Sequence, residues 1–180
     1  MLEKRPSRRL VRERRINIVP ALIIRFSRKS DGTSVIACER EDGSTTWERR
    51  KFDFFPLHDL THFAVESTLG FRHGFYGLLV NGWQITDFGD VKLPPNISEE
   101  AILVESIVSL LDQEMGTGIR MEAEEFSEAL NAALSGLESP VRREISREEL
   151  NVIREMRLEL FGKWANTNSG DSLELRIDFA

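Results

Sequence analysis

The segment FFPLHDLTHFAVE, residues 54–66, gathers side chains that can hold a metal ion. His58 and His62 are four residues apart. Asp59 lies between them, and Glu66 follows four residues after the second histidine. At about 100° per residue, these four side chains fall within one quadrant of a helix. The pattern therefore predicts a helix with one polar face that carries two imidazoles and two carboxylates.

Two imidazoles one helical turn apart can bind the same ion, because side chains at positions i and i+4 project in the same direction. We predict that His58 and His62 bind Zn²⁺ or another divalent metal. Glu66 is predicted either as a further metal ligand or as a partner that orients the His62 ring. Asp59 follows the first histidine, where zinc proteases of the H-E-x-x-H type carry their catalytic glutamate. It is therefore predicted as the catalytic residue, a general base, or as a direct ligand because its side chain is one methylene shorter.

The same arrangement also fits an ordinary helix. A polar helix face collects histidines and carboxylates that are solvated, or that hydrogen-bond to neighbours at the domain surface. His73, the third histidine, falls on the same face only if the helix continues past Gly70. It is a candidate third ligand in that case, and a surface histidine otherwise.

Residues 58–62 resemble the H-D-x-x-H zinc motif of the Coq-type ubiquinone-biosynthesis proteins. The resemblance implies zinc binding by both histidines. In that family a glutamate twelve residues after the second histidine completes the site, and this chain has Gly74 at that position. The family is all-helical, whereas this chain contains strand patterns. The longer segment FFPLHDLTHFAVE is also similar to one in small bacterial proteins of no named function, a resemblance that implies no activity.

Composition narrows the class of protein. The chain has 180 residues, of which 41% are hydrophobic and 30% charged, as in a soluble globular domain. No apolar run approaches the roughly 20 residues that span a bilayer, so no membrane association is expected. The single cysteine, Cys38, excludes an internal disulfide and is predicted to be a small core or half-buried residue rather than a nucleophile. We expect a cytoplasmic protein.

Charge is unevenly distributed along the chain. Residues 1–15 contain seven basic and two acidic side chains, so their net charge is +5. The rest of the chain carries −11, which gives the net charge of −6. We predict a basic, disordered arm over residues 1–15 and a single α+β domain over residues 16–180. The acidic body makes nucleic acid an unexpected partner, except through the basic arm.

Strand patterns occupy residues 16–26, 34–40, 45–50 and 172–179. The first three are separated by Asp31-Gly32 and Asp42-Gly43, which are typical of tight turns, so they predict an antiparallel meander. The last segment alternates apolar and charged residues, which indicates a strand with one buried face. We predict that it pairs with the strand at 16–26.

Helical patterns occupy residues 57–69, 98–115, 122–136 and 146–164, with a short or irregular helix within 71–83. Ser98 and Ser146 are predicted N-caps, and Ser146 forms a capping box with Glu149. The order of elements predicts an α+β fold: an antiparallel sheet, made of the N-terminal meander and the C-terminal strand, with four to five helices packed on one face.

Two functions fit these observations. The first is a metal-binding protein with hydrolase-type activity at the histidine helix. The alternative is a non-enzymatic interaction domain that forms a homo-oligomer. Trp47 fits either packing beneath a helix or a place on a binding surface.

Overall fold

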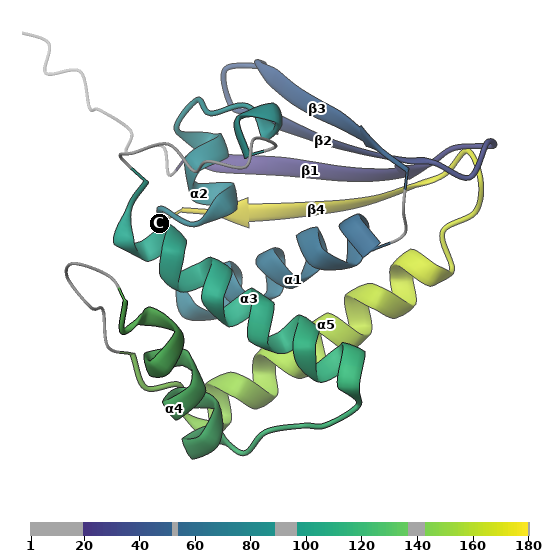
Figure 1. The fold of residues 1–180 in the computed structure, drawn as a ribbon. Coiled ribbons are helices and arrows are strands. Elements are labelled where there is room, and N and C mark those ends of the chain that lie inside the picture. Colours follow the sequence, from purple (N-terminus) through teal and green to yellow (C-terminus); the bar gives the residue numbers. More distant parts are fainter. Residues whose placement is uncertain (1–19, 52–53, 89–96, 137–142, 180) are drawn as a thin grey trace, which may run out of the picture.

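The computed structural model describes residues 20–51, 54–88, 97–136 and 143–179. The predicted basic arm, residues 1–15, lies outside these ranges, as do residues 16–19 of the first predicted strand. Within them, a four-stranded antiparallel sheet and five α-helices form an α+β fold (Figure 1), which confirms the predicted fold class.

The sheet has the order β3-β2-β1-β4. Its strands are β1 (Ala21–Arg28), β2 (Ser34–Arg40), β3 (Thr45–Arg50) and β4 (Ser172–Asp178). The C-terminal strand pairs with β1, as the sequence predicted.

Two Asp-Gly turns join the meander. Gly32 and Gly43 have φ angles of 80° and 79°, which other residues rarely adopt. The preceding Asp31 carboxylate accepts a hydrogen bond from the Thr33 amide at 3.1 Å, and Asp42 does the same for Ser44 at 2.9 Å. These local bonds fix the register of both hairpins.

The face of the sheet towards the helices is apolar. Ile24 is paired with Cys38 on one side and with Leu175 on the other. Cys38 is fully buried, which confirms it as a core residue, and burial raises its pKa to about 12. Trp47 lies opposite Ala37 and is 64% exposed, so the prediction that it packs beneath a helix is wrong.

The helices are α1 (Phe54–Leu69), α2 (Phe75–Val80), α3 (Glu99–Thr117), α4 (Ala123–Leu134) and α5 (Arg147–Ala165), with a 3₁₀ turn η1 at Ile85–Phe88. They lie on one side of the sheet, and α1 contacts both α3 and α5 (Figure 1). This arrangement surrounds α1 with other elements. No helix among these segments is long and apolar enough to cross a membrane.

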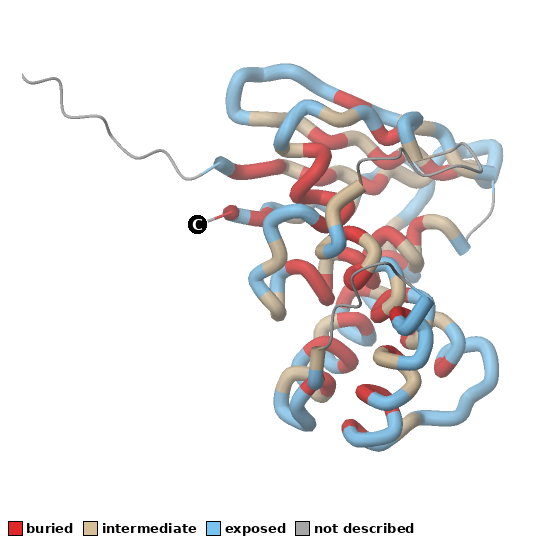
Figure 2. The backbone as a smooth tube through the Cα atoms, turned by 60° about the vertical axis from the view of Figure 1, so that its left-hand side comes forward, coloured by how far each residue is buried: buried red, intermediate tan, exposed pale blue. Residues whose placement is uncertain are grey.

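Helix boundaries follow the capping residues. The Ser98 hydroxyl accepts a hydrogen bond from the Ala101 amide at 3.0 Å, and Ser146 and Glu149 form the predicted capping box. Helix α1 begins three residues before the predicted Leu57, because a proline such as Pro56 is tolerated in a first helical turn. Figure 2 shows buried residues concentrated where the sheet and helices meet, and these include much of α1.

Candidate metal centre

The polar face of α1 is inside the protein. His62 is 4% exposed, Asp59 is 4% exposed and Glu66 is 1% exposed. The interpretation of a solvated face is therefore wrong for these three side chains. His58 is the most accessible of the four, with 22% of its side chain exposed. A buried cluster of ionisable groups requires partners, because unpaired charges are costly to bury.

The two histidines face each other through the same ring atom. His62 Nε2 lies 3.3 Å from His58 Nε2, with the ring centroids 4.8 Å apart. Two ligand atoms at about 2.05 Å from a tetrahedral zinc ion are about 3.3 Å apart. The helix therefore already holds both nitrogens at the separation that a shared ion requires.

Helix α3 contributes a carboxylate to the same point. Glu105 Oε2 lies 3.2 Å from His62 Nε2, and Glu105 Oε1 lies 4.0 Å from His58 Nε2. One ligand atom from each of these three residues lies within 4.8 Å of the other two. The arrangement can hold one divalent cation with two nitrogens and one carboxylate, which leaves a coordination position open to water or substrate.

The outer ring nitrogens also face carboxylates. Asp112, seven residues after Glu105 on α3, places Oδ2 2.8 Å from His58 Nδ1. Glu66 Oε1 lies 3.4 Å from His62 Nδ1, a contact whose geometry does not make a hydrogen bond. Each imidazole thus has an acidic group behind it, while both Nε2 atoms point to the shared position.

Glu66 is itself held in place by backbone amides. Its Oε2 accepts hydrogen bonds from the Tyr76 amide at 3.0 Å and the Gly77 amide at 3.2 Å. A Cβ atom at Gly74 would lie 2.6 Å from Glu66 Cδ, so this glycine leaves room for the carboxylate. Glu66 therefore lies behind His62, on the side of Nδ1, rather than at the position that the two Nε2 atoms share.

Asp59 is a buried carboxylate with unused hydrogen-bonding capacity. Its Oδ2 has no hydrogen-bond partner among the described residues. Burial raises its pKa to about 6, against the opposing effect of Arg50 and the two histidines. A carboxyl group with such a pKa can exchange a proton near neutral pH, which is what a general base requires.

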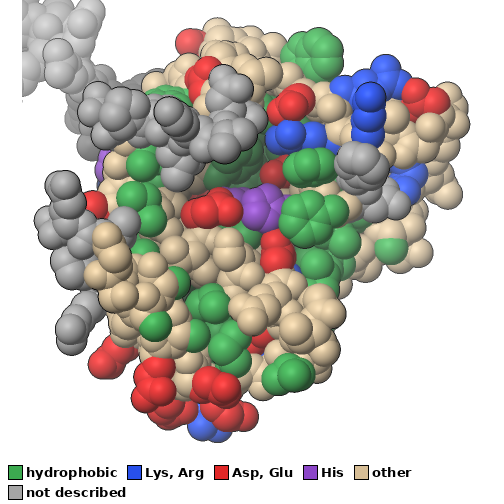
Figure 3. All heavy atoms as spheres, viewed as in Figure 1, with side chains coloured by type: hydrophobic (Ala, Val, Ile, Leu, Met, Phe, Trp, Pro, Cys, Tyr) green, Lys and Arg blue, Asp and Glu red, His purple; other side chains and the backbone are tan. Residues whose placement is uncertain are grey.

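A cavity of about 580 Å³ opens beside the three candidate ligands. Its polar lining includes His58, His62 and Glu105, together with Asp59. Its apolar lining consists of Phe55, Phe75, Leu78, Phe88, Ile97, Ala101 and Ile102. In Figure 3 a histidine side chain reaches the surface between acidic and hydrophobic side chains, beside a hollow. Cavities with apolar walls and a few convergent polar groups are typical of small-molecule sites.

Charge in the cluster favours a cation. Burial lowers the pKa of His62, but its contacts with Glu105 and Glu66 outweigh this effect and raise the pKa to about 10. The hydrogen bond with His62 in turn lowers the pKa of Glu105. In the metal-free protein a proton on His62 therefore neutralises part of the acidic cluster, and a metal ion would replace that proton.

Sequence reasoning missed Glu105 and Asp112. Their spacing of seven residues places both on one side of α3, but the sequence does not reveal that this side meets α1. His73 lies elsewhere: its side chain is 59% exposed, and its Nδ1 is 3.7 Å from Glu100 Oε2. It is not part of the cluster formed with His58 and His62.

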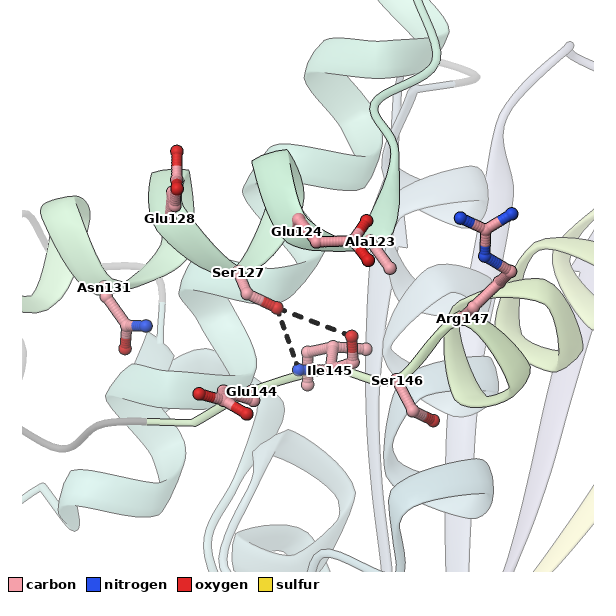
Figure 4. Close-up of a pocket in the computed structure, with 9 residues that line it drawn as sticks. All are labelled: Ala123, Glu124, Ser127, Glu128, Asn131, Glu144, Ile145, Ser146 and Arg147. Carbon is pink, nitrogen blue, oxygen red and sulfur yellow. Dashed lines mark hydrogen bonds between the residues drawn. The ribbon is translucent and has the colours of Figure 1, made fainter.

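A second cavity, of about 570 Å³, lies between α4 and residues 144–147 (Figure 4). It contains several acidic side chains, but its buried polar groups are paired. The Ser127 hydroxyl accepts a hydrogen bond from the Ile145 amide at 3.0 Å and lies 3.4 Å from the Ile145 carbonyl. None of the nine lining residues has a buried side-chain atom without a partner, so nothing here indicates a ligand.

Comparison with known proteins returns no match to a family model, a curated protein or a solved structure. The resemblances described above therefore stay predictions.

Proposed function

We propose that this chain binds a divalent metal, with Zn²⁺ as the first candidate, and performs hydrolase-type chemistry in the adjoining cavity. The ligands are His58, His62 and Glu105. The observation that carries the proposal is the 3.3 Å separation of the two histidine Nε2 atoms, with a Glu105 oxygen 3.2 Å from one of them. Two nitrogens and one carboxylate form a ligand set used by catalytic zinc sites.

Asp59 takes the role of general base in this proposal. A zinc ion held by His58, His62 and Glu105 would supply an activated water as the nucleophile. Asp59 lines the same cavity, and its carboxylate is the group assigned here to accept the proton of that water. The apolar walls suit a small substrate with an aromatic or aliphatic portion.

Metal content tests the binding half of the proposal. Protein prepared without a histidine tag and dialysed against zinc should retain about one equivalent, and His58→Ala should lose it. His73→Ala is the matched control, because His73 is an exposed histidine outside the cluster. Retention of less than about a tenth of an equivalent, unchanged by His58→Ala, would contradict metal binding.

Hydrolysis tests the catalytic half. Zinc-loaded protein should hydrolyse small aryl esters faster than the metal-free protein does. Asp59→Asn should lower the rate by about 10²- to 10⁴-fold while zinc stays bound. Equal rates with and without zinc would limit the function to metal binding.

An exposed aromatic side chain favours a second candidate function. Trp47 is 64% exposed and lies on the opposite face of β3 from the buried Thr46. In this proposal the chain is an interaction domain that pairs with a second copy through that face. Sedimentation at several concentrations, with and without residues 1–15, tests it, and Trp47→Glu should shift a dimer to monomer. A monomer at every concentration would contradict it.

A further inference from the structure

We infer that Asp112 is a positioning residue of the metal site: its carboxylate fixes the His58 ring so that Nε2 faces the cation. The inference rests on the proposed function. It adds a residue that contacts the ligand His58 but is not itself a proposed metal ligand. Its basis is the 2.8 Å contact between Asp112 Oδ2 and His58 Nδ1. With a proton on Nδ1, the lone pair needed for metal binding is on Nε2.

The Asp112 carboxylate is held from α5. Arg157 Nη2 donates to Asp112 Oδ1 at 3.1 Å, and its Nε donates to Thr61 Oγ1 at 3.0 Å. Arg157 is 6% exposed, so this bond lies in the interior. The guanidinium therefore ties α5 to both α1 and α3 at one point. Because Oδ1 of Asp112 accepts from Arg157, its Oδ2 is oriented towards the His58 imidazole.

The arrangement is asymmetric between the two histidines. Asp112 forms a hydrogen bond with His58, whereas the Glu66 contact with His62 does not. His58 is also the more accessible ring, with 22% of its side chain exposed against 5% for His62. His62 is thus held by its burial and by its contact with Glu105, whereas on the Nδ1 side of the more accessible His58 ring the restraining polar contact is the Asp112 hydrogen bond.

Helices α3 and α5, which carry Asp112 and Arg157, also contain a second ion pair that serves as a matched control. Arg154 of α5 donates through Nε to Glu114 Oε2 at 3.1 Å, and both residues are buried. Glu114 is two residues from Asp112 on α3, and it contacts neither histidine. Glu114→Gln thus perturbs a buried ion pair between α3 and α5, and it acts on the Asp112 support only electrostatically, through Arg157.

The test compares zinc affinity in full-length wild type, Asp112→Asn and Glu114→Gln, measured by competition with a chromophoric chelator. Asp112→Asn should weaken zinc binding by about 10- to 100-fold, and Glu114→Gln should leave it within about twofold. Circular dichroism establishes that each variant is folded. Asp112→Asn binding as tightly as wild type would overturn the inference, as would equal weakening in Glu114→Gln. Absence of zinc binding by wild type would instead overturn the proposed function, and this inference with it.

A measurement on wild type keeps the inference testable even if Asp112→Asn does not fold. Nitrogen-15 NMR of the zinc-loaded protein should show His58 protonated on Nδ1 and bound to zinc through Nε2. A His58 ring bound through Nδ1 would overturn the assignment of Asp112.

Discussion

Zinc binding should release a proton from His62. The pKa of His62 in the metal-free protein is raised to about 10, chiefly because Glu105 and Glu66 outweigh the effect of burial. This pKa is about three units above pH 7, so competition by the proton should weaken zinc binding at pH 7 by about a thousandfold, or about 4 kcal/mol.

Calorimetry in buffers of different ionisation enthalpy counts the protons. At pH 8 zinc binding should release close to two, one from His62 and one from zinc-bound water, whose pKa is about 7. His73→Ala should give the same number, because His73 lies outside the cluster. The water alone accounts for at most one proton. Release of one proton or fewer, or a neutral His62 ring in the metal-free protein at pH 8 by nitrogen-15 NMR, would refute this reasoning.

Three further predictions concern stability. First, the folded-state pKa of His62, about 10, exceeds its ordinary value of 6.5, so its ion pairs stabilise the metal-free protein fully below pH 6.5. The free energy of unfolding should fall between pH 7 and pH 10, by up to about 1.4 kcal/mol per pH unit, as urea titrations can measure. Second, the pKa of Asp59 is raised from 3.8 to about 6, so its ionisation costs stability as the pH rises from about 4 to 6, and the full cost remains above pH 6. Asp59→Asn should therefore raise the free energy of unfolding at pH 7 by up to about 3 kcal/mol, with a higher melting temperature, but should hardly change it at pH 4. Equal effects at both pH values would contradict this cause. Third, Gly74→Ala should displace the Glu66 carboxylate and cost about 1–3 kcal/mol in chemical denaturation. Gly162→Ala, inside α5 with open space around its Cβ, should instead raise stability by up to about 1 kcal/mol. A Gly74→Ala protein as stable as wild type would show that Glu66 can move freely.

The elements of this fold could be predicted because their determinants are local. Asp31-Gly32 and Asp42-Gly43 define the turns, and the alternation in residues 172–179 defines the last strand. Ser98 and Ser146 cap their helices through bonds within three residues. Each of these patterns depends only on residues close together in the sequence.

The site could be predicted only in part, because half of it is not local. The spacing of His58 and His62 is a property of one helix, and that prediction needed nothing else. Glu105 and Asp112 come from a helix about 45 to 50 residues later, and only tertiary packing brings them to α1. The helical wheel placed the polar face of α1 correctly, but it did not reveal that α3 covers that face.

Trp47 illustrates a different limit. The strand TTWERR contains one strongly apolar residue, so alternation alone does not reveal which of its faces is buried. The structure buries Thr46, whose hydroxyl accepts a hydrogen bond from the Ile85 amide at 2.9 Å, and turns Trp47 outward. A tertiary hydrogen bond, rather than hydrophobicity, therefore accompanies the orientation of this strand.

The pairing of β4 with β1 has a consequence for biosynthesis. β1 is an interior strand, yet its neighbour on one side is separated from it by more than 140 residues. Until that neighbour leaves the ribosome, β1 would present an unpaired edge that carries Leu22, Ile24 and Phe26. Nascent chains that stall before residue 172 should therefore be prone to aggregation, and chaperones that bind exposed apolar strands should recognise them.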